Sequence, residues 1–148
     1  MKTRMSFLLL PILLAVTSIQ AQHAEKTLVK SFNLNGQTAV FLDLDGGSVN
    51  VVNWTEPQMR IQMNITLQNG SETMLKSLVT AGRYNLNTKT EDGKLSIVAP
   101  GLDRQMKLGN GQVLGEEITY QVFAPKDVAI TTRNQDGIGQ VGSPRASY

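Results

Sequence analysis

The chain has 148 residues, with 14 lysines and arginines, 12 aspartates and glutamates, and no cysteine. Without Lys2 and Arg4, the basic residues fall from 14 to 12 and equal the acidic ones. A neutral domain without a basic cluster argues against binding to nucleic acid or to an anionic membrane. Without cysteine, the domain depends on its hydrophobic core and not on disulfides.

The first 21 residues are typical of a cleavable secretory signal peptide. Lys2 and Arg4 precede an apolar run from Met5 to Val16, and the small residue Ala21 is suited to the cleavage site. The run is shorter than the ~20 apolar residues of a membrane-spanning helix, and Pro11 interrupts it. No cysteine follows it to carry a lipid anchor. We therefore expect export to the periplasm, the outer surface or the extracellular space, with no membrane span in the mature chain.

Short segments typical of β-strands, separated by turn dipeptides, follow the signal. The clearest is 58–68, in which every odd position is apolar and every even position polar, so that one strand face is buried. Turn signals include Asn35-Gly36 and Asp92-Gly93. The expected strands are 28–34, 37–45, 48–54, 58–68, 83–90, 94–99, 117–124 and 128–133.

One segment, 71–82, has a helical pattern instead. Ser71 is a candidate N-cap and Gly82 a candidate residue just past the helix end. Its apolar residues fall on one helical stripe, which predicts a short helix covering part of a sheet. These residues are Met74, Leu75, Leu78 and Val79.

Several strands also place large apolar side chains on the face opposite the expected core. These side chains are Phe41, Val52, Trp54 and Phe123. We expect the helix and loops to cover this second face, since monomers seldom expose contiguous apolar patches. The alternatives are contact with another subunit, which would make the protein a homo-oligomer, or a bulge that shifts the register.

Together these patterns predict a single all-β domain with one short helix. We expect mostly antiparallel strands in a sandwich or roll, with a β-solenoid as the alternative. The segment from Asn134 has no periodic apolar face and several glycines. The predicted organisation is a signal peptide at 1–21, a β-rich domain at 22–133 and a flexible C-terminal tail at 134–148.

The residue types needed by common catalysts are scarce. His23 is the one histidine, next to the expected mature N-terminus, so Ser-His-Asp, Cys-His and typical zinc sites are not expected. There is no phosphate-binding glycine-rich motif. We therefore predict no catalytic, cofactor-binding or metal residues, no cofactor, and a protein that is not an enzyme.

A carbohydrate site is the alternative interpretation. Asp43 and Asp45 lie two apart, with β-carbons ~7 Å apart on one strand face, a separation found between the paired acids of inverting glycosidases. Trp54 at a strand end could stack on a sugar, with Asn50 and Asn53 as hydrogen-bonding neighbours. The simpler interpretation is that the aspartates solvate a strand end before Gly-Gly and that Trp54 is packed.

Five features of the chain occur in the same order as in a known group of proteins. They are the segment 42–51, Leu-Asp-Leu-Asp-Gly-Gly-Ser-Val-Asn-Val, then Trp54, the alternating strand at 59–67, the short helix, and the Asp-Gly-Lys-Leu-Ser-Ile segment at 92–97. In these features the chain resembles the bacterial putative-adhesin family. This is a domain-of-unknown-function group of exported envelope proteins. The resemblance covers about 26–129 and implies a β-rich fold tending toward a β-solenoid, with no catalytic residues to transfer. The chain departs from the family by ending in a Gly/Ser-rich tail instead of further strands. The predicted function is that of an exported, non-enzymatic envelope protein, an adhesin-like binding or structural domain whose surface partner or glycan is unknown. A carbohydrate-binding module or carbohydrate-active enzyme is the alternative.

Overall fold

The computed structural model describes residues 23–134 and 137–141, so the expected signal peptide lies outside the described residues. Nine strands, one α-helix and a short 3₁₀ helix make up this part of the chain. Their bounds are β1 Ala24–Phe32, β2 Ala39–Asp43, β3 Gly47–Trp54, β4 Met59–Leu67, α1 Glu72–Thr80, β5 Asn87–Glu91, β6 Lys94–Val98, η1 Pro100–Leu102, β7 Glu116–Pro125, β8 Ala129–Asn134 and β9 Gly137–Val141.

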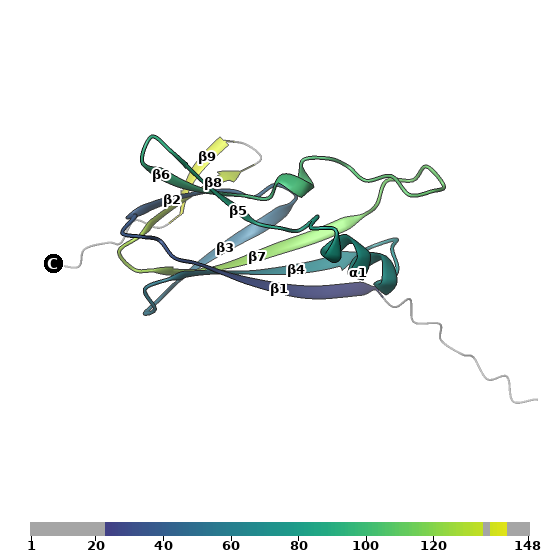
Figure 1. Ribbon diagram of the computed structural model, residues 1–148, viewed down its shortest axis with the longest axis horizontal. Helices are drawn as coiled ribbons and strands as arrows, with labels where there is room; N and C mark the ends of the chain where they lie inside the picture. The colour runs from purple at the N-terminus through teal and green to yellow at the C-terminus, as the bar shows by residue number, and fades with distance from the viewer. Residues whose placement is uncertain (1–22, 135–136, 142–148) are drawn as a thin grey trace, which may run out of the picture.

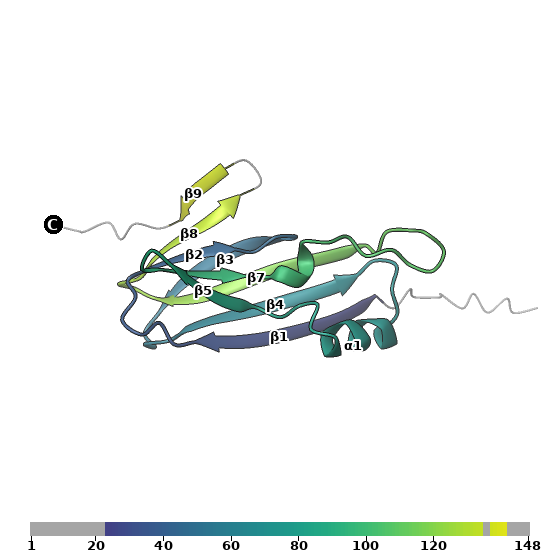
Figure 2. The same cartoon turned by 45° about the horizontal axis from the view of Figure 1, so that its top comes forward.

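The strands form two sheets packed against each other (Figure 1). Sheet A has the order β1-β4-β7-β3, and sheet B has the order β5-β6-β2-β8-β9. Figure 2 shows the β8–β9 hairpin at one edge of sheet B, where β8 pairs with β2. The single all-β domain with one short helix is therefore confirmed.

Both sheets are mixed, with four antiparallel and three parallel strand pairings. In sheet B, β2 lies between β6 and β8 and is parallel to both. The chain runs from β6 into sheet A as β7, parallel to β3, and returns to sheet B as β8. This part of the chain coils through the two sheets as in a β-solenoid, while the other pairings are those of an antiparallel sandwich.

Strand β4 is the centre of the core, as its alternation predicts. It pairs with β1 on one side and β7 on the other. Its five inward side chains, Met59, Ile61, Met63, Ile65 and Leu67, are at most 2% exposed. Burial of each such side chain stabilises the fold by about 1.5–3 kcal/mol, so this strand contributes a large share of the hydrophobic free energy.

Helix α1 forms where the sequence predicts it. The Ser71 Oγ accepts a hydrogen bond from the Met74 amide at 3.1 Å and caps the N-terminus. The helix ends before Gly82, whose φ of +81° suits a residue without a side chain. Leu75 and Leu78 are buried, and the helix packs on β1 at one end of sheet A (Figure 1). Within the described residues, no helix is long and apolar enough to cross a bilayer.

Three expectations differ from the structure. The strand expected at 83–90 begins only at Asn87, because the chain forms a turn after α1 that buries Arg83 and Tyr84. Part of the expected tail, Gly137–Val141, forms strand β9 antiparallel to β8. The sequence did not predict this strand, because its glycines interrupt the hydrophobic alternation. The rest of the tail, 135–136 and 142–148, lies outside the described residues.

The third difference concerns the second apolar face. Phe41 alternates with the buried residues Val40 and Leu42 in sheet B and therefore points to the outside of that sheet. Val52, Trp54 and Phe123 belong to strands of sheet A. The four side chains do not form one surface, because the chain crosses from sheet B to sheet A between β2 and β3.

Candidate functional site

Three loops meet at one end of the sandwich and enclose an open cleft of about 600 Å³. They connect β1 to β2, β3 to β4, and β7 to β8. Loops at the end of a β-sandwich are common binding elements, because the two sheets hold them in place. The lining combines Trp54 and two prolines with amide, hydroxyl and charged side chains: Asn33, Asn35, Gln37, Thr38, Thr55, Glu56, Lys126 and Asp127.

The first of these loops has a defined conformation. The Asn35 amide donates to Asn33 Oδ1 at 3.0 Å, and the Gln37 amide donates to the Leu34 carbonyl at 2.9 Å. Asn35 and Gly36 both have positive φ, at 49° and 79°, as a type I′ turn requires. The Asn35-Gly36 turn that the sequence predicts therefore forms one wall of the cleft.

The third loop is fixed to the first. The Ala129 amide donates to the Thr38 carbonyl at 2.8 Å, and the Val128 amide donates to the Pro125 carbonyl at 3.2 Å. The first bond joins the start of β8 to the end of the β1–β2 loop, and the second closes the turn between β7 and β8. These hydrogen bonds hold two walls of the cleft, the β1–β2 and β7–β8 loops, in a defined conformation.

Trp54 borders the cleft at the end of β3 and is only partly buried. Its Nε1 donates to the Gln58 carbonyl at 2.9 Å, which fixes the plane of the indole. The Phe123 ring lies 5.5 Å away, centroid to centroid, and the Arg60 guanidinium carbon lies 4.9 Å from the indole centroid. Aromatic and cation–π contacts of this kind hold an indole rigidly.

The outer face of sheet A beyond Trp54 has mainly polar side chains in rows across the strands. One row consists of Val29, Gln62, Gln121 and Asn50, and the Asn50 amide donates to Gln121 Oε1 at 3.0 Å. In the next row the Thr27 hydroxyl donates to Asn64 Oδ1 at 2.8 Å. These two rows contain no charged residue.

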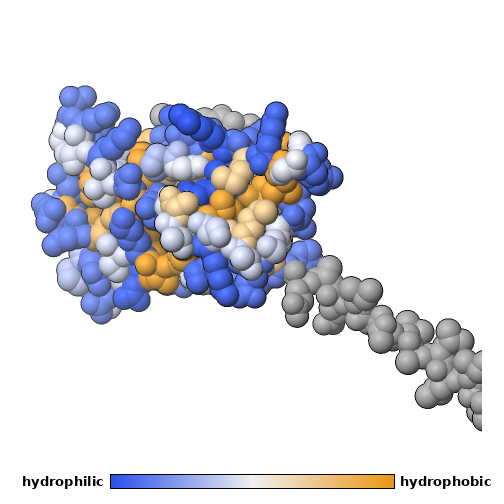
Figure 3. Space-filling model, turned by 45° about the vertical axis from the view of Figure 1, so that its right-hand side comes forward, coloured by the Kyte–Doolittle hydropathy of each residue, from blue (hydrophilic) through white to orange (hydrophobic). Residues whose placement is uncertain are grey.

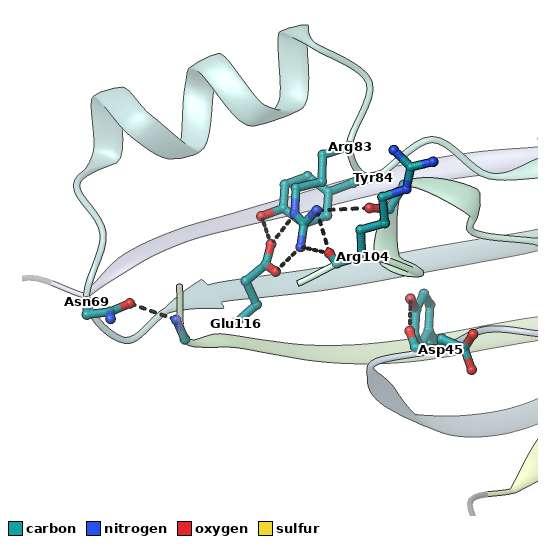
Figure 4. A network of polar contacts seen from close by, with 9 residues as sticks. Asp45, Asn69, Arg83, Tyr84, Arg104 and Glu116 are labelled. Carbon is teal, nitrogen blue, oxygen red and sulfur yellow. Dashed lines mark hydrogen bonds and ion pairs between the residues drawn. The ribbon is translucent and has the colours of Figure 1, made fainter. Parts of the chain in front are cut away.

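The carbohydrate-site residues singled out in the sequence do not meet. Asp43 lies 3.1 Å from Arg133 Nη1, and its Oδ1 makes no aligned hydrogen bond. Asp45 accepts a hydrogen bond from the Tyr120 hydroxyl through its backbone carbonyl at 3.1 Å (Figure 4) and borders a different open cleft. Trp54 lies at the far end of β3, roughly 23 Å along the strand. Asp43, Asp45 and Trp54 therefore cannot act as one site.

A buried ion pair that no sequence pattern indicated lies elsewhere (Figure 4). Arg83 pairs with Glu116 through both Nε, at 2.7 Å, and Nη2, and it also donates to the carbonyls of Gly101 and Arg104. The Tyr84 hydroxyl donates to the same carboxylate at 2.6 Å. Burial opposes ionisation, but the hydrogen bonds from Arg83 and Tyr84 outweigh it and lower the pKa of Glu116.

This cluster joins three segments of the fold, 83–84, 101–104 and the start of β7, and its ion pair is buried. The Arg83 and Glu116 side chains are 7% and 12% exposed. A buried, fully paired guanidinium has no donor left for a ligand, so we assign the cluster a structural role. Among the described residues, no group of three or more His, Cys, Asp or Glu side chains is placed to hold a metal ion.

Comparisons with known proteins give no family. No protein-family model matches the chain, and no curated protein does. A crystal structure of a putative cell adhesion protein from Clostridium sporogenes ATCC 15579 is similar at 14% identity and a TM-score of 0.41, over 73% of this chain and 45% of that one. This chain thus spans less than half the length of that protein. At this level the likeness supports no functional argument, and membership of the putative-adhesin family stays a prediction.

The cleft at the loop end combines an aromatic ring with polar side chains. On the face that Figure 3 shows, apolar side chains lie in separate patches surrounded by hydrophilic ones. At the cleft, by contrast, an indole and many polar side chains surround one hollow. The sequence pointed to Trp54 and Asn50, but the loops that form the cleft with Trp54 are brought together only by the fold.

Proposed function

We propose that this protein is an exported, non-enzymatic binding domain of the cell envelope that recognises a glycan through the cleft bordered by Trp54. The observation that carries the proposal is the indole itself: it is held rigid, partly exposed, and placed among amide and hydroxyl side chains. Sugars present both an apolar face and a ring of hydroxyl groups, so an aromatic surface beside fixed hydrogen-bonding groups suits them.

The order of the cleft supports binding without large rearrangement. Its loops are held by backbone and side-chain hydrogen bonds within the protein. A pre-ordered site loses less conformational entropy on binding than a mobile one. We therefore expect a glycan to bind with little change in the conformation of these loops.

The proposed export depends on the first 21 residues. We expect secreting cells to remove them and leave a mature chain that begins at Gln22. Cell fractionation with mass measurement of the recovered protein tests this step. Full-length protein in the cytosol would contradict it.

Tryptophan fluorescence tests the binding site directly, because Trp54 is the one tryptophan of the chain. A glycan that packs against the indole is expected to cause a saturable change in emission, confirmed by calorimetry. Replacing Asn33 in the cleft by alanine should weaken binding, whereas the matched change Thr119→Ala, on the sheet away from the cleft, should not. If no glycan of a broad panel binds by either method, the proposal fails.

A second role, as a structural subunit that associates with further copies of the chain, is favoured by strand β3. It lies at the edge of sheet A, has no charged residue, and leaves Val52 40% exposed. Of the other edge strands, β1 and β5 carry charges, which usually prevent edge-to-edge pairing, whereas β9, like β3, has none.

Sedimentation over a concentration series distinguishes this role. Self-association through β3 should disappear in Val52→Lys and persist in Thr119→Lys, a matched change on a central strand of the same face. A monomer at every concentration would contradict the structural role and leave glycan binding unaffected.

A further inference from the structure

The proposed glycan site has a cation beside it that the fold leaves unpaired. Resting on the proposed function, we infer that the glycan is anionic and that Arg60 binds its acidic group, a sugar carboxylate.

Arg60 points outward from a central strand of sheet A. Its neighbours on β4, Met59 and Ile61, are fully buried in the core, so Arg60 faces the opposite side. In the register of the sheet it stands between Ser31 of β1 and Phe123 of β7. It is the only basic residue among the outward positions of the four paired strands.

Among the residues that the structure describes, no carboxylate forms an ion pair with this guanidinium. Ion pairs in the described part of the chain join Glu72 to Lys76, Arg83 to Glu116, and Asp43 to Arg133, and none includes Arg60. The acidic residues of the same sheet face, Glu25 and Glu117, are in the row that contains Thr66, six residues along β4. That is roughly 20 Å away, well beyond ion-pair distance.

The guanidinium is nevertheless held in place. Its carbon lies 4.9 Å from the centroid of the Trp54 indole, and its Nε is buried without a hydrogen-bond partner in the described residues. The cation–π contact with the indole restricts the motion of the guanidinium. Because Nε is buried, the two terminal Nη groups are the donors left for a ligand. Arg60 as a whole is only partly buried, so it can meet a ligand.

Trp54 connects this cation to the cleft. The same indole lines the cleft and contacts the guanidinium. A sugar packed against the indole therefore lies close to Arg60. A planar guanidinium binds a carboxylate with two parallel hydrogen bonds, an arrangement that fits an acidic sugar better than a neutral one. The amides of Gln62 and Gln121, in the adjoining row, can bind the hydroxyls of the next sugar.

The charges of the cleft itself restrict where the acidic group lies. Its loops contribute Glu56, Lys126 and Asp127, all exposed, for a formal charge of −1. An anionic group would be repelled there, although solvent screens these side chains. We therefore place the acidic group on the side of sheet A, at Arg60.

Calorimetry of the mature exported protein with polygalacturonate and its fully methyl-esterified form tests the inference, because the two polymers share a backbone and differ in the carboxylate. We expect at least tenfold tighter binding of the acid form, weakened by salt. Arg60→Gln should remove the difference in affinity between the two polymers. Arg60→Lys keeps the positive charge but cannot form two parallel hydrogen bonds, so it should retain part of that difference. Lys89→Gln, on β5 of the other sheet, is the matched control and should change nothing.

The outcomes separate this inference from the proposed function. Equal binding of both polymers, lost in Trp54→Phe but not in Arg60→Gln, would overturn the role of Arg60 and leave the glycan cleft standing. Binding of dextran sulfate in preference to polygalacturonate would overturn the assignment of a carboxylate. Binding of none of these polymers, with no response from the wider glycan panel, would overturn both. Circular dichroism of each variant establishes that it folds.

Discussion

The Arg83 guanidinium and the Glu116 carboxylate, 33 residues apart in the chain, form a buried ion pair at a Nε–Oε1 distance of 2.7 Å. Arg83 follows helix α1, and Glu116 is the first residue of β7. The pair therefore joins the helical connection to the central part of sheet A. Tyr84 and the carbonyls of Gly101 and Arg104 complete its hydrogen bonding.

Removing one partner of this pair should be strongly destabilising. Glu116→Gln leaves the buried Arg83 charge uncompensated, and we expect the free energy of unfolding to fall by about 3 kcal/mol. The double change Arg83→Met with Glu116→Gln should cost less than the sum of the two single changes, because no unpaired charge remains. Urea unfolding of the four proteins measures this coupling.

Lys76→Gln is the control for that series. It breaks an ion pair with Glu72 whose side chains are 66% and 73% exposed, and such pairs contribute little in water. We expect no measurable change in unfolding. A Glu116→Gln protein as stable as Lys76→Gln would show that the buried pair does not hold the fold together.

The same carboxylate predicts how stability depends on pH. Burial opposes ionisation of Glu116, but hydrogen bonds from Arg83 and Tyr84 lower its pKa in the folded protein below the ordinary value of 4.5. Because the folded pKa is the lower one, the stabilisation is fully present above pH 4.5 and is lost as the pH falls through the folded pKa. The stability difference between wild type and Glu116→Gln should therefore be constant near neutral pH and shrink in acid. A difference that grows in acid would contradict the assignment.

A close backbone approach predicts a third effect. A Cβ at Gly101 would lie 2.1 Å from the Arg83 carbonyl oxygen, which cannot move without disturbing the ion pair. We expect Gly101→Ala to lower the free energy of unfolding by about 1–3 kcal/mol. Gly109→Ala is the matched control, since a Cβ there meets no atom within 4 Å. Equal stability of the two variants in urea unfolding would contradict the close approach.

The N-cap of α1 predicts a smaller effect. Ser71→Ala removes the acceptor for the Met74 amide and should lower the free energy of unfolding by about 1 kcal/mol. Ser71→Asp keeps an acceptor and should restore most of the stability. Thermal unfolding of the three proteins measures the difference, and an Ala variant equal to wild type would show that the cap is dispensable.

Local patterns predicted most of the elements because each depends on neighbours in sequence. The alternation around Met63 predicted β4, and the dipeptides Asn35-Gly36 and Asp92-Gly93 adopt the positive φ values that their turns need. Strand β9 escaped prediction because it forms by backbone pairing with β8 and has no apolar alternation to reveal it.

Side-chain alternation along each segment already shows which strand faces are buried, because the hydrophobic effect acts on each strand locally. Which strands are neighbours, and so which side chains meet, depends on how the whole chain folds. Trp54, Arg60 and Phe123 come from three different strands, and their contact depends on the register of β4 and β3 with β7. The same holds for Arg83 and Glu116. Periodicity reports whether a side chain is buried, whereas a site depends on long-range pairing that no single segment encodes.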